Sequence, residues 1–115
     1  MDNFTRAYIA CLLWQATDNN GEPLDMYDDD DISPEDIATI QQDCADFQES
    51  NADLLEQAGT DEQNGHDFCL TRNGHGAGFW DRGYGPVGEE LSEACKPYGM
   101  LDCCLGDDEK IYIHN

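Results

Sequence analysis

Residues 33–59 read SPEDIATIQQDCADFQESNADLLEQAG and carry the clearest helix signal in the chain. Ser33 is a candidate N-cap, and Pro34 suits the first helical position. Acidic residues follow in the first turn, where the helix dipole favours negative charge. Gly59 is typical of the residue that directly follows a helix. The segment therefore predicts one long helix that ends at about Ala58.

The expected helix separates its apolar and acidic side chains onto opposite sides. At 100° per residue the apolar positions lie near one meridian, and most carboxylates lie on the far side. Like charges at i, i+4 cost about 0.2–0.5 kcal/mol per pair, and no cation is interspersed here. The stripe therefore calls for an explanation beyond solubility. Its apolar positions are Ile37, Ile40, Cys44, Phe47 and Leu54, and its carboxylates are Glu35, Asp43, Asp46, Glu49, Asp53 and Glu56.

The rest of the chain extends the acidic character of this helix. The 115 residues contain 26 Asp and Glu against five Lys and Arg, a formal net charge of −21. No Lys or Arg occurs between Arg6 and Arg72. The length fits a single domain, with an acidic helical half over 1–62 and a half rich in Gly and aromatics over 63–115. Such a charge indicates either solubility or adaptation to high salt, or a partner with a large positive surface.

The outer segments predict an α+β fold. The order is two N-terminal helices, a β-hairpin, a third helix and a second β-hairpin, with the helices on one face of a small antiparallel sheet. Asn73-Gly74 is the turn signal of the first hairpin. Beside the long helix, the expected elements are a helix over 3–16, strands over 67–71 and 78–81, a helix over 86–98, and strands over 101–105 and 110–113.

The segment over 66–85 is the main candidate for chemistry. One interpretation is a small enzyme or ligand-binding module that uses His66, His75, Cys69 and Arg72, with a Cys–His or Asp–His catalytic pair. The other is a tight structural hairpin in which Arg72 and Arg82 pair with Asp67 or Asp81. We favour the structural interpretation and expect no enzyme activity.

Metal and cofactor sites are not expected. Neither 18–22 nor 28–31 has the spacing of an EF-hand loop, so only weak surface binding of divalent cations is predicted. Zinc could use His66 and Cys69 with Cys103 and Cys104, but adjacent residues of a strand point to opposite faces. No segment has the roughly 20 apolar residues of a membrane span, and the N-terminus does not resemble a signal peptide. We therefore expect a cytoplasmic protein with reduced cysteines.

The acidic stripe favours mimicry of DNA charge. Carboxylates three or four residues apart lie about 4.5–6 Å apart along a helix axis, and DNA phosphates follow every ~3.4 Å along a strand. A basic DNA-binding protein is the expected partner, with binding that weakens in salt. The chain lacks the basic patch needed to bind nucleic acid itself. The expected partner-binding residues are Asp28, Asp29, Asp30, Asp31, Asp43, Asp46, Glu49, Asp53 and Glu56.

Three sequence blocks resemble a family of small acidic proteins of tailed bacteriophages. They are FTRAYIACLLWQATDNNGEPLD (4–25), the 31–48 block with IQQDCADFQ, and HDFCLTRNGHGAGFWDRGYG (66–85). The resemblance supplies no catalytic residues. It implies action in the host bacterial cytoplasm, in host takeover or in counter-defence such as anti-CRISPR or anti-restriction. The chain would act as a monomer or homodimer; a structural protein of the virion is the alternative.

Overall fold

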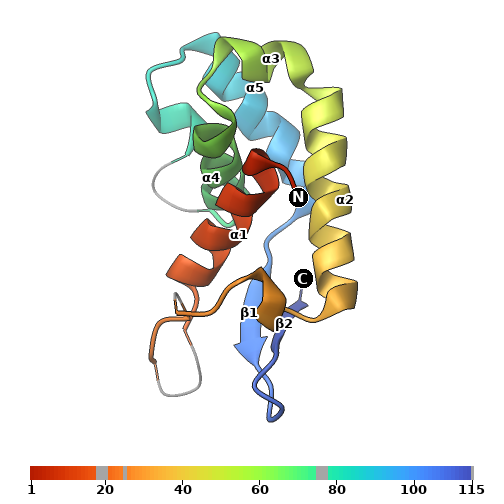
Figure 1. The fold of residues 1–115 in the computed structure, drawn as a ribbon. Helices are drawn as coiled ribbons and strands as arrows, with labels where there is room; N and C mark the ends of the chain where they lie inside the picture. The colour runs from red at the N-terminus through yellow and green to blue at the C-terminus, as the bar shows by residue number, and fades with distance from the viewer. Residues whose placement is uncertain (18–20, 25, 75–77, 115) are drawn as a thin grey trace.

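The computed structural model describes residues 1–17, 21–24, 26–74 and 78–114, and most of them are helical (Figure 1). The two strands form one antiparallel hairpin with Cys103 opposite Ile113. In chain order the elements are α1 (Asn3–Gln15), the 3₁₀ turn η1 (Asp29–Asp31), α2 (Pro34–Ser50), α3 (Ala52–Gln57), α4 (Asp61–Arg72), the 3₁₀ turn η2 (Phe79–Asp81), α5 (Pro86–Cys95), the 3₁₀ turn η3 (Lys96–Tyr98), β1 (Asp102–Leu105) and β2 (Ile111–His114).

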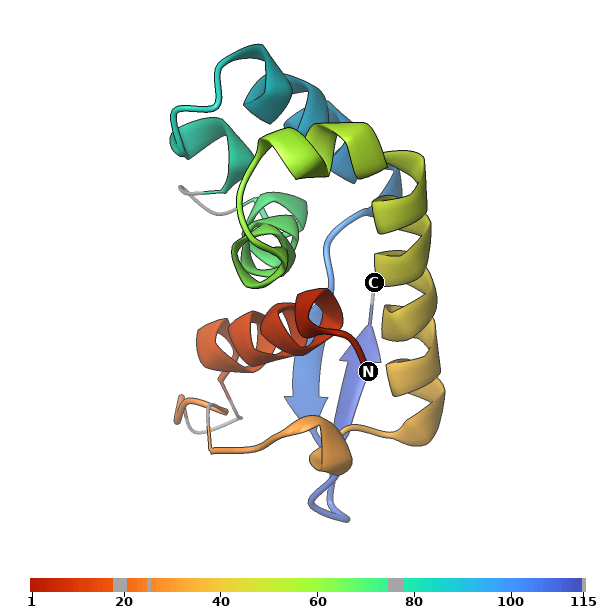
Figure 2. The same cartoon turned by 45° about the horizontal axis from the view of Figure 1, so that its top comes forward.

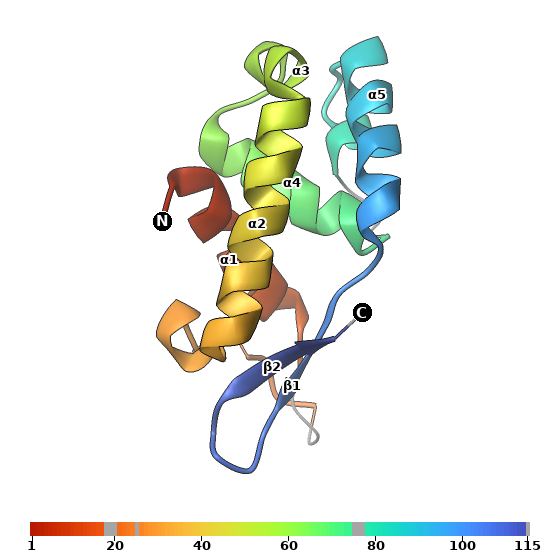
Figure 3. The same cartoon turned by 90° about the vertical axis from the view of Figure 1, so that its right-hand side faces the viewer.

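The layout differs from the one expected from the sequence. The fold is α+β, but the helices pack on one another, and the only sheet among the described residues is the C-terminal hairpin. That hairpin lies at one end of the molecule, beside the start of α2 (Figures 1 and 3). The expectation of helices on one face of a sheet is therefore wrong. The first helix and the second hairpin were placed correctly, to within one or two residues.

The first expected hairpin is wrong, because its first strand belongs to helix α4. Thr60 caps this helix by accepting a hydrogen bond from the Gln63 amide at 3.2 Å, and two acidic residues occupy the first turn. Asn73 and Gly74 end the helix instead of turning a hairpin, and Gly74 has a φ of +70°. The expected strand over 78–81 is the 3₁₀ turn η2.

Helices α1 and α4 pack directly on each other (red and green in Figure 2). Gly65 of α4 lies against the backbone of α1, where a Cβ atom would overlap the carbonyl oxygen of Phe4. The side of α4 that faces the protein also buries three polar residues, Asn64, Asp67 and Arg72. The Asn64 side chain donates hydrogen bonds to the carbonyls of Leu55 and Gly59. A glycine and paired polar groups thus replace part of the usual apolar stripe.

The long acidic helix begins as expected but is broken near its end. The Ser33 hydroxyl accepts a hydrogen bond from the Asp36 amide at 3.4 Å, and Pro34 is the first helical residue. Helix α2 ends at Ser50, where the Asn51 amide side chain donates to the Phe47 carbonyl at 2.9 Å. The following helix, α3, takes a different direction from α2 (Figure 1). The prediction of one continuous helix to Ala58 is wrong for this reason.

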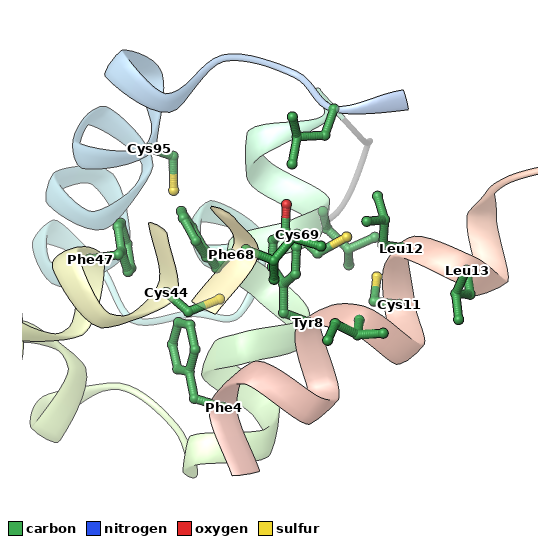
Figure 4. Close-up of a cluster of buried hydrophobic side chains, with 14 of the residues drawn as sticks. Phe4, Tyr8, Cys11, Leu12, Leu13, Cys44, Phe47, Phe68, Cys69 and Cys95 are labelled. Atoms are coloured by element: carbon green, nitrogen blue, oxygen red, sulfur yellow. The ribbon is translucent and has the colours of Figure 1, made fainter. Parts of the chain in front are cut away.

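Aromatic rings from both halves of the chain form the core (Figure 4). Phe47 of α2 stacks on Phe68 of α4 with ring centroids 4.1 Å apart, and Phe4 of α1 lies 5.9 Å from Phe68. Phe79 of η2 also stacks on Phe47, with ring centroids 5.9 Å apart. The residues over 1–62 and 63–115 therefore share one core.

The hairpin holds the start of α2 through hydrogen bonds. The Ser33 amide donates to the Ile111 carbonyl at 2.9 Å. The Asp36 carboxylate accepts from the Ser33 hydroxyl at 2.7 Å and from the Ile113 amide at 3.0 Å. One carboxylate thus connects the helix cap and strand β2, and it fixes the direction in which α2 leaves the hairpin.

Candidate functional site: an acidic face and its groove

Four of the expected carboxylates are exposed on α2 and α3, and we call them the acidic face: Asp46, Glu49, Asp53 and Glu56. The opposite side of α2 is buried through Ile40, Cys44 and Phe47. Figure 3 looks onto α2 with α3 and α5 beside its C-terminal end. Among the described residues, no Lys or Arg forms an ion pair with these four carboxylates. Their charges therefore face solvent without compensation.

Asp43 differs from the other expected carboxylates of the stripe. Its carboxylate lies 2.9 Å from Nη1 of Arg72, whose side chain is only 2 % exposed. Arg72 also donates to the carbonyls of Gly99 at 2.6 Å and Tyr98 at 3.0 Å. The prediction that Arg72 pairs with Asp67 or Asp81 is therefore wrong, because its partner is Asp43. Asp43 compensates a buried cation, so its charge is not free for a partner.

The acidic run Asp28–Asp31 lies at the other end of α2, around η1. Two of its carboxylates cap the run itself: Asp28 accepts from the Asp30 amide and Asp31 from the Asp28 amide, both at 3.0 Å. Asp28 and Asp29 also line a small pocket of about 220 Å³ together with Arg6. A cation of the chain itself therefore lies near this part of the acidic run.

The break at Asn51 divides the acidic face between two hollows. Glu49 and Asp53 line a groove of about 1070 Å³ between the α2–α3 junction and α5. Glu56 instead lines a second hollow of about 580 Å³ near the start of α4. We call the first of these the acidic groove. The carboxylates are consequently not one straight row along a helix.

Sequence reasoning missed the opposite wall of the acidic groove. Helix α5 contributes Glu89, Glu90 and Glu93, so that five carboxylates line the groove. The sequence contains a signal for this wall, because Leu91 and Cys95 lie four positions apart in the expected helix over 86–98, and both are buried. The glutamates then had to face outward, but their position opposite α2 depends on tertiary packing.

Trp80 also lines the acidic groove, and its side chain is 54 % exposed. Its neighbour Phe79 is fully buried and anchors η2. The Phe79 amide donates to the Thr71 hydroxyl at 3.1 Å, and Gly88 of α5 packs against the Phe79 carbonyl. These contacts hold the indole at the surface beside α5.

The residues of the alternative enzyme interpretation do not form the expected hairpin. Cys69 is fully buried on α4, and burial raises the pKa of its thiol well above the usual range. A nucleophilic thiol needs the opposite shift. Arg72 is buried with Asp43, His66 is half-buried on α4, and His75 lies outside the described residues.

Asp67 takes the other arginine of this segment as its partner. Its fully buried carboxylate accepts from Nε and Nη2 of Arg82, with the shortest contact at 2.8 Å. This pairing confirms part of the structural interpretation, in which Arg82 was expected to bind Asp67 or Asp81. Hydrogen bonding to Asp67 raises the pKa of the Arg82 guanidinium.

Clusters suited to a metal ion are not found in the described ranges. No group of three or more His, Cys, Asp or Glu side chains there has the required arrangement. Asp18, from the first acidic segment tested against the EF-hand pattern, lies outside the described residues. All six cysteines are free thiols, and Cys104 Sγ lies 2.9 Å from His114 Nε2 on the hairpin.

The described helices and the comparisons with known proteins give two further findings. None of the helices over the described residues combines the length and the apolar character needed to cross a membrane. Comparisons with protein-family models, with curated proteins and with solved structures found no match to the chain.

Proposed function

We propose that this protein is an acidic inhibitor that binds a basic, DNA-binding protein by presenting a surface with the charge of DNA. The observation that carries the proposal is the acidic face itself, four exposed carboxylates that no cation of the described residues pairs with. Three of the five cations of the chain, Arg72, Arg82 and Lys96, pair with carboxylates outside these four.

The physical reason is the cost of such a surface. Repulsion among uncompensated carboxylates opposes folding, and a partner rich in Lys and Arg removes it on binding. Binding would release counterions and weaken as salt rises, as for a protein on DNA. The target that we propose is a bacterial DNA-binding protein, such as a CRISPR effector or a restriction enzyme, in line with the phage family expected from the sequence.

A capture experiment with matched charge variants tests the proposal. The chain is immobilised and exposed to bacterial lysate at low and at high salt, and captured proteins are identified by mass. We expect a basic DNA-binding protein that is lost at high salt and that duplex DNA displaces. Capture that duplex DNA leaves unchanged would contradict mimicry.

Two variants locate the binding surface. The triple variant Asp46→Lys, Glu49→Lys and Asp53→Lys should abolish capture. The control variant Asp102→Lys, Asp107→Lys and Glu109→Lys changes the net charge equally on the hairpin and should keep it. Circular dichroism shows whether both remain folded. An equal loss of capture in the two variants would mean that only the overall charge matters.

A further inference from the structure

We propose that the acidic groove binds an arginine-bearing segment of the partner, with a guanidinium group stacked on the Trp80 indole. The proposal rests on the proposed function, because it names the place on the acidic surface where the basic partner makes its most specific contact. It commits to arginine as the recognised side chain and to Trp80 as the residue that distinguishes it from lysine.

The size of the groove suits several side chains of one segment. Its volume is about 1070 Å³, slightly above the range typical of pockets for small molecules, about 300–1,000 Å³. The α2–α3 junction forms one wall and α5 the other. A protruding loop or extended segment can therefore enter between the helices without any movement of the core.

The charge of the lining selects a cationic occupant. Five carboxylates and no Lys or Arg belong to the described lining. Lys96 reaches Glu93 from outside at 2.8 Å, but both side chains are about 70 % exposed, so this pair is weak and a bound cation can replace it. An acidic or neutral segment would gain nothing from the carboxylates or would be repelled by them.

Trp80 adds a preference for arginine. Tryptophan offers the most favourable aromatic face to a cation, and the planar guanidinium stacks on it better than the ammonium of lysine does. The indole is 54 % exposed, and the neighbouring Phe79 is fully buried, which fixes the backbone from which the indole projects. A surface built for general charge attraction alone would not need this ring.

The other two acidic hollows lack this combination. The hollow that contains Glu56 also contains Asp61 and Glu62, but these two lie in the first turn of α4, and its lining among the described residues includes no aromatic side chain. The small pocket beside Asp28 already contains Arg6. The acidic groove is the one of the three that joins carboxylates from two sides with an exposed indole.

Peptide titration with a single tryptophan as reporter tests the proposal. The variant Trp14→Phe leaves Trp80 as the only tryptophan, and it is titrated with hexa-arginine and with hexalysine at low salt. We expect hexa-arginine to change the Trp80 emission and to bind about three- to tenfold more tightly than hexalysine, which carries the same charge. Equal affinities with unchanged Trp80 emission would overturn the proposal.

Matched variants separate the groove from general electrostatics. The reverse variant Trp80→Phe reports on Trp14, which is 58 % exposed on α1 and does not line the groove, and its emission should stay constant. The pair Glu49→Gln and Glu90→Gln should weaken hexa-arginine binding several-fold more than Asp107→Asn and Glu109→Gln. Equal weakening by the two pairs would contradict a defined site.

The two proposals fail in different experiments. Hexa-arginine binding at Trp80 without capture of any basic protein from lysate would support the groove and contradict the proposed function. Capture that is lost in the Asp46, Glu49 and Asp53 variant but unchanged in Trp80→Ala would support the proposed function and contradict the groove as the specific contact.

Discussion

The guanidinium of Arg72 lies 2.9 Å from the carboxylate of Asp43, and the pair joins the acidic helix α2 to α4 at the edge of the core. Arg72 also donates to the Tyr8 hydroxyl at 3.2 Å and to the backbone that follows α5. A single buried cation thus connects α1, α2, α4 and the segment that leads to the hairpin. It holds the helix that carries much of the acidic face.

Replacing Arg72 should destabilise the protein strongly. In Arg72→Met the Tyr8 hydroxyl and two backbone carbonyls lose a donor, and the Asp43 carboxylate loses its cation. Removal of one partner of a buried pair costs about 3–5 kcal/mol, and the 23 % exposure of Asp43 favours the lower end. Urea denaturation measures the free energy of unfolding. Lys96→Met, which breaks an exposed pair, is the control and should have little effect.

Asp43 and Asp46 should contribute differently to partner binding. Asp43 already compensates Arg72, whereas Asp46 is exposed and accepts a hydrogen bond from the uncharged Gln42 side chain at 2.9 Å. Asp46→Asn should weaken binding and reduce its salt dependence, and Asp43→Asn should instead lower stability while affinity is kept. The dissociation constant at two salt concentrations and a urea titration of each variant distinguish these effects. Equal loss of affinity in both variants would contradict this division.

Gly65→Ala should destabilise the protein, although alanine is the better helix former. On an exposed helix surface the change gains about 1 kcal/mol. At Gly65 the new methyl group would overlap the Phe4 carbonyl oxygen, and α1 would have to move away from α4. Overpacking of this kind costs about 1–3 kcal/mol. A urea midpoint that rises instead of falling would show that the helices are not in close contact there.

Alkaline pH should lower the stability of the reduced protein. Burial raises the pKa of the Cys44 and Cys95 thiols to about 12, compared with about 8.5 for a thiol in an unfolded chain. Above pH ~8.5 the unfolded chain releases thiol protons that the folded chain keeps, so folding becomes less favourable as pH rises toward 12. The contribution is complete below that window and falls by up to about 1.4 kcal/mol per pH unit for each thiol.

Urea titrations at several pH values, with a reducing agent present, measure this dependence. The variant Cys95→Ala should show a smaller loss of stability per pH unit than the parent chain, whatever its stability at neutral pH. An unchanged slope would mean that Cys95 does not keep its proton in the folded state.

The sequence predicted the elements whose signals are local. Ser33 and Pro34 mark the start of α2 because a cap and a fixed φ act within one turn, and the C-terminal hairpin follows from alternation and a turn. Helix α4 was missed because Asn64, Gly65 and Asp67 occupy its inward side, so an apolar period of 3.6 residues cannot reveal it. Their burial depends on partners elsewhere in the fold, such as Arg82 for Asp67.

The candidate site could be predicted in composition but not in shape. Asp46, Glu49, Asp53 and Glu56 are exposed, as the helical periodicity implied. The bend at Asn51 and the approach of α5 arise from packing, and they turn a supposed row of charges into a groove. Asp43 was assigned to the stripe because no local pattern indicates that Arg72, 29 positions later, reaches it inside the fold.

The placement of the five basic residues also determines where trypsin-like proteases can cleave this chain. A trypsin-like enzyme needs Lys or Arg in its acidic specificity pocket. No bond over residues 7–71 offers one, even when the chain is fully unfolded. Beyond that segment, Arg72 is buried inside the core and Arg82 is held by Asp67. The segment that carries the acidic face therefore offers no cleavage site to this class of enzyme, whatever the stability of the fold.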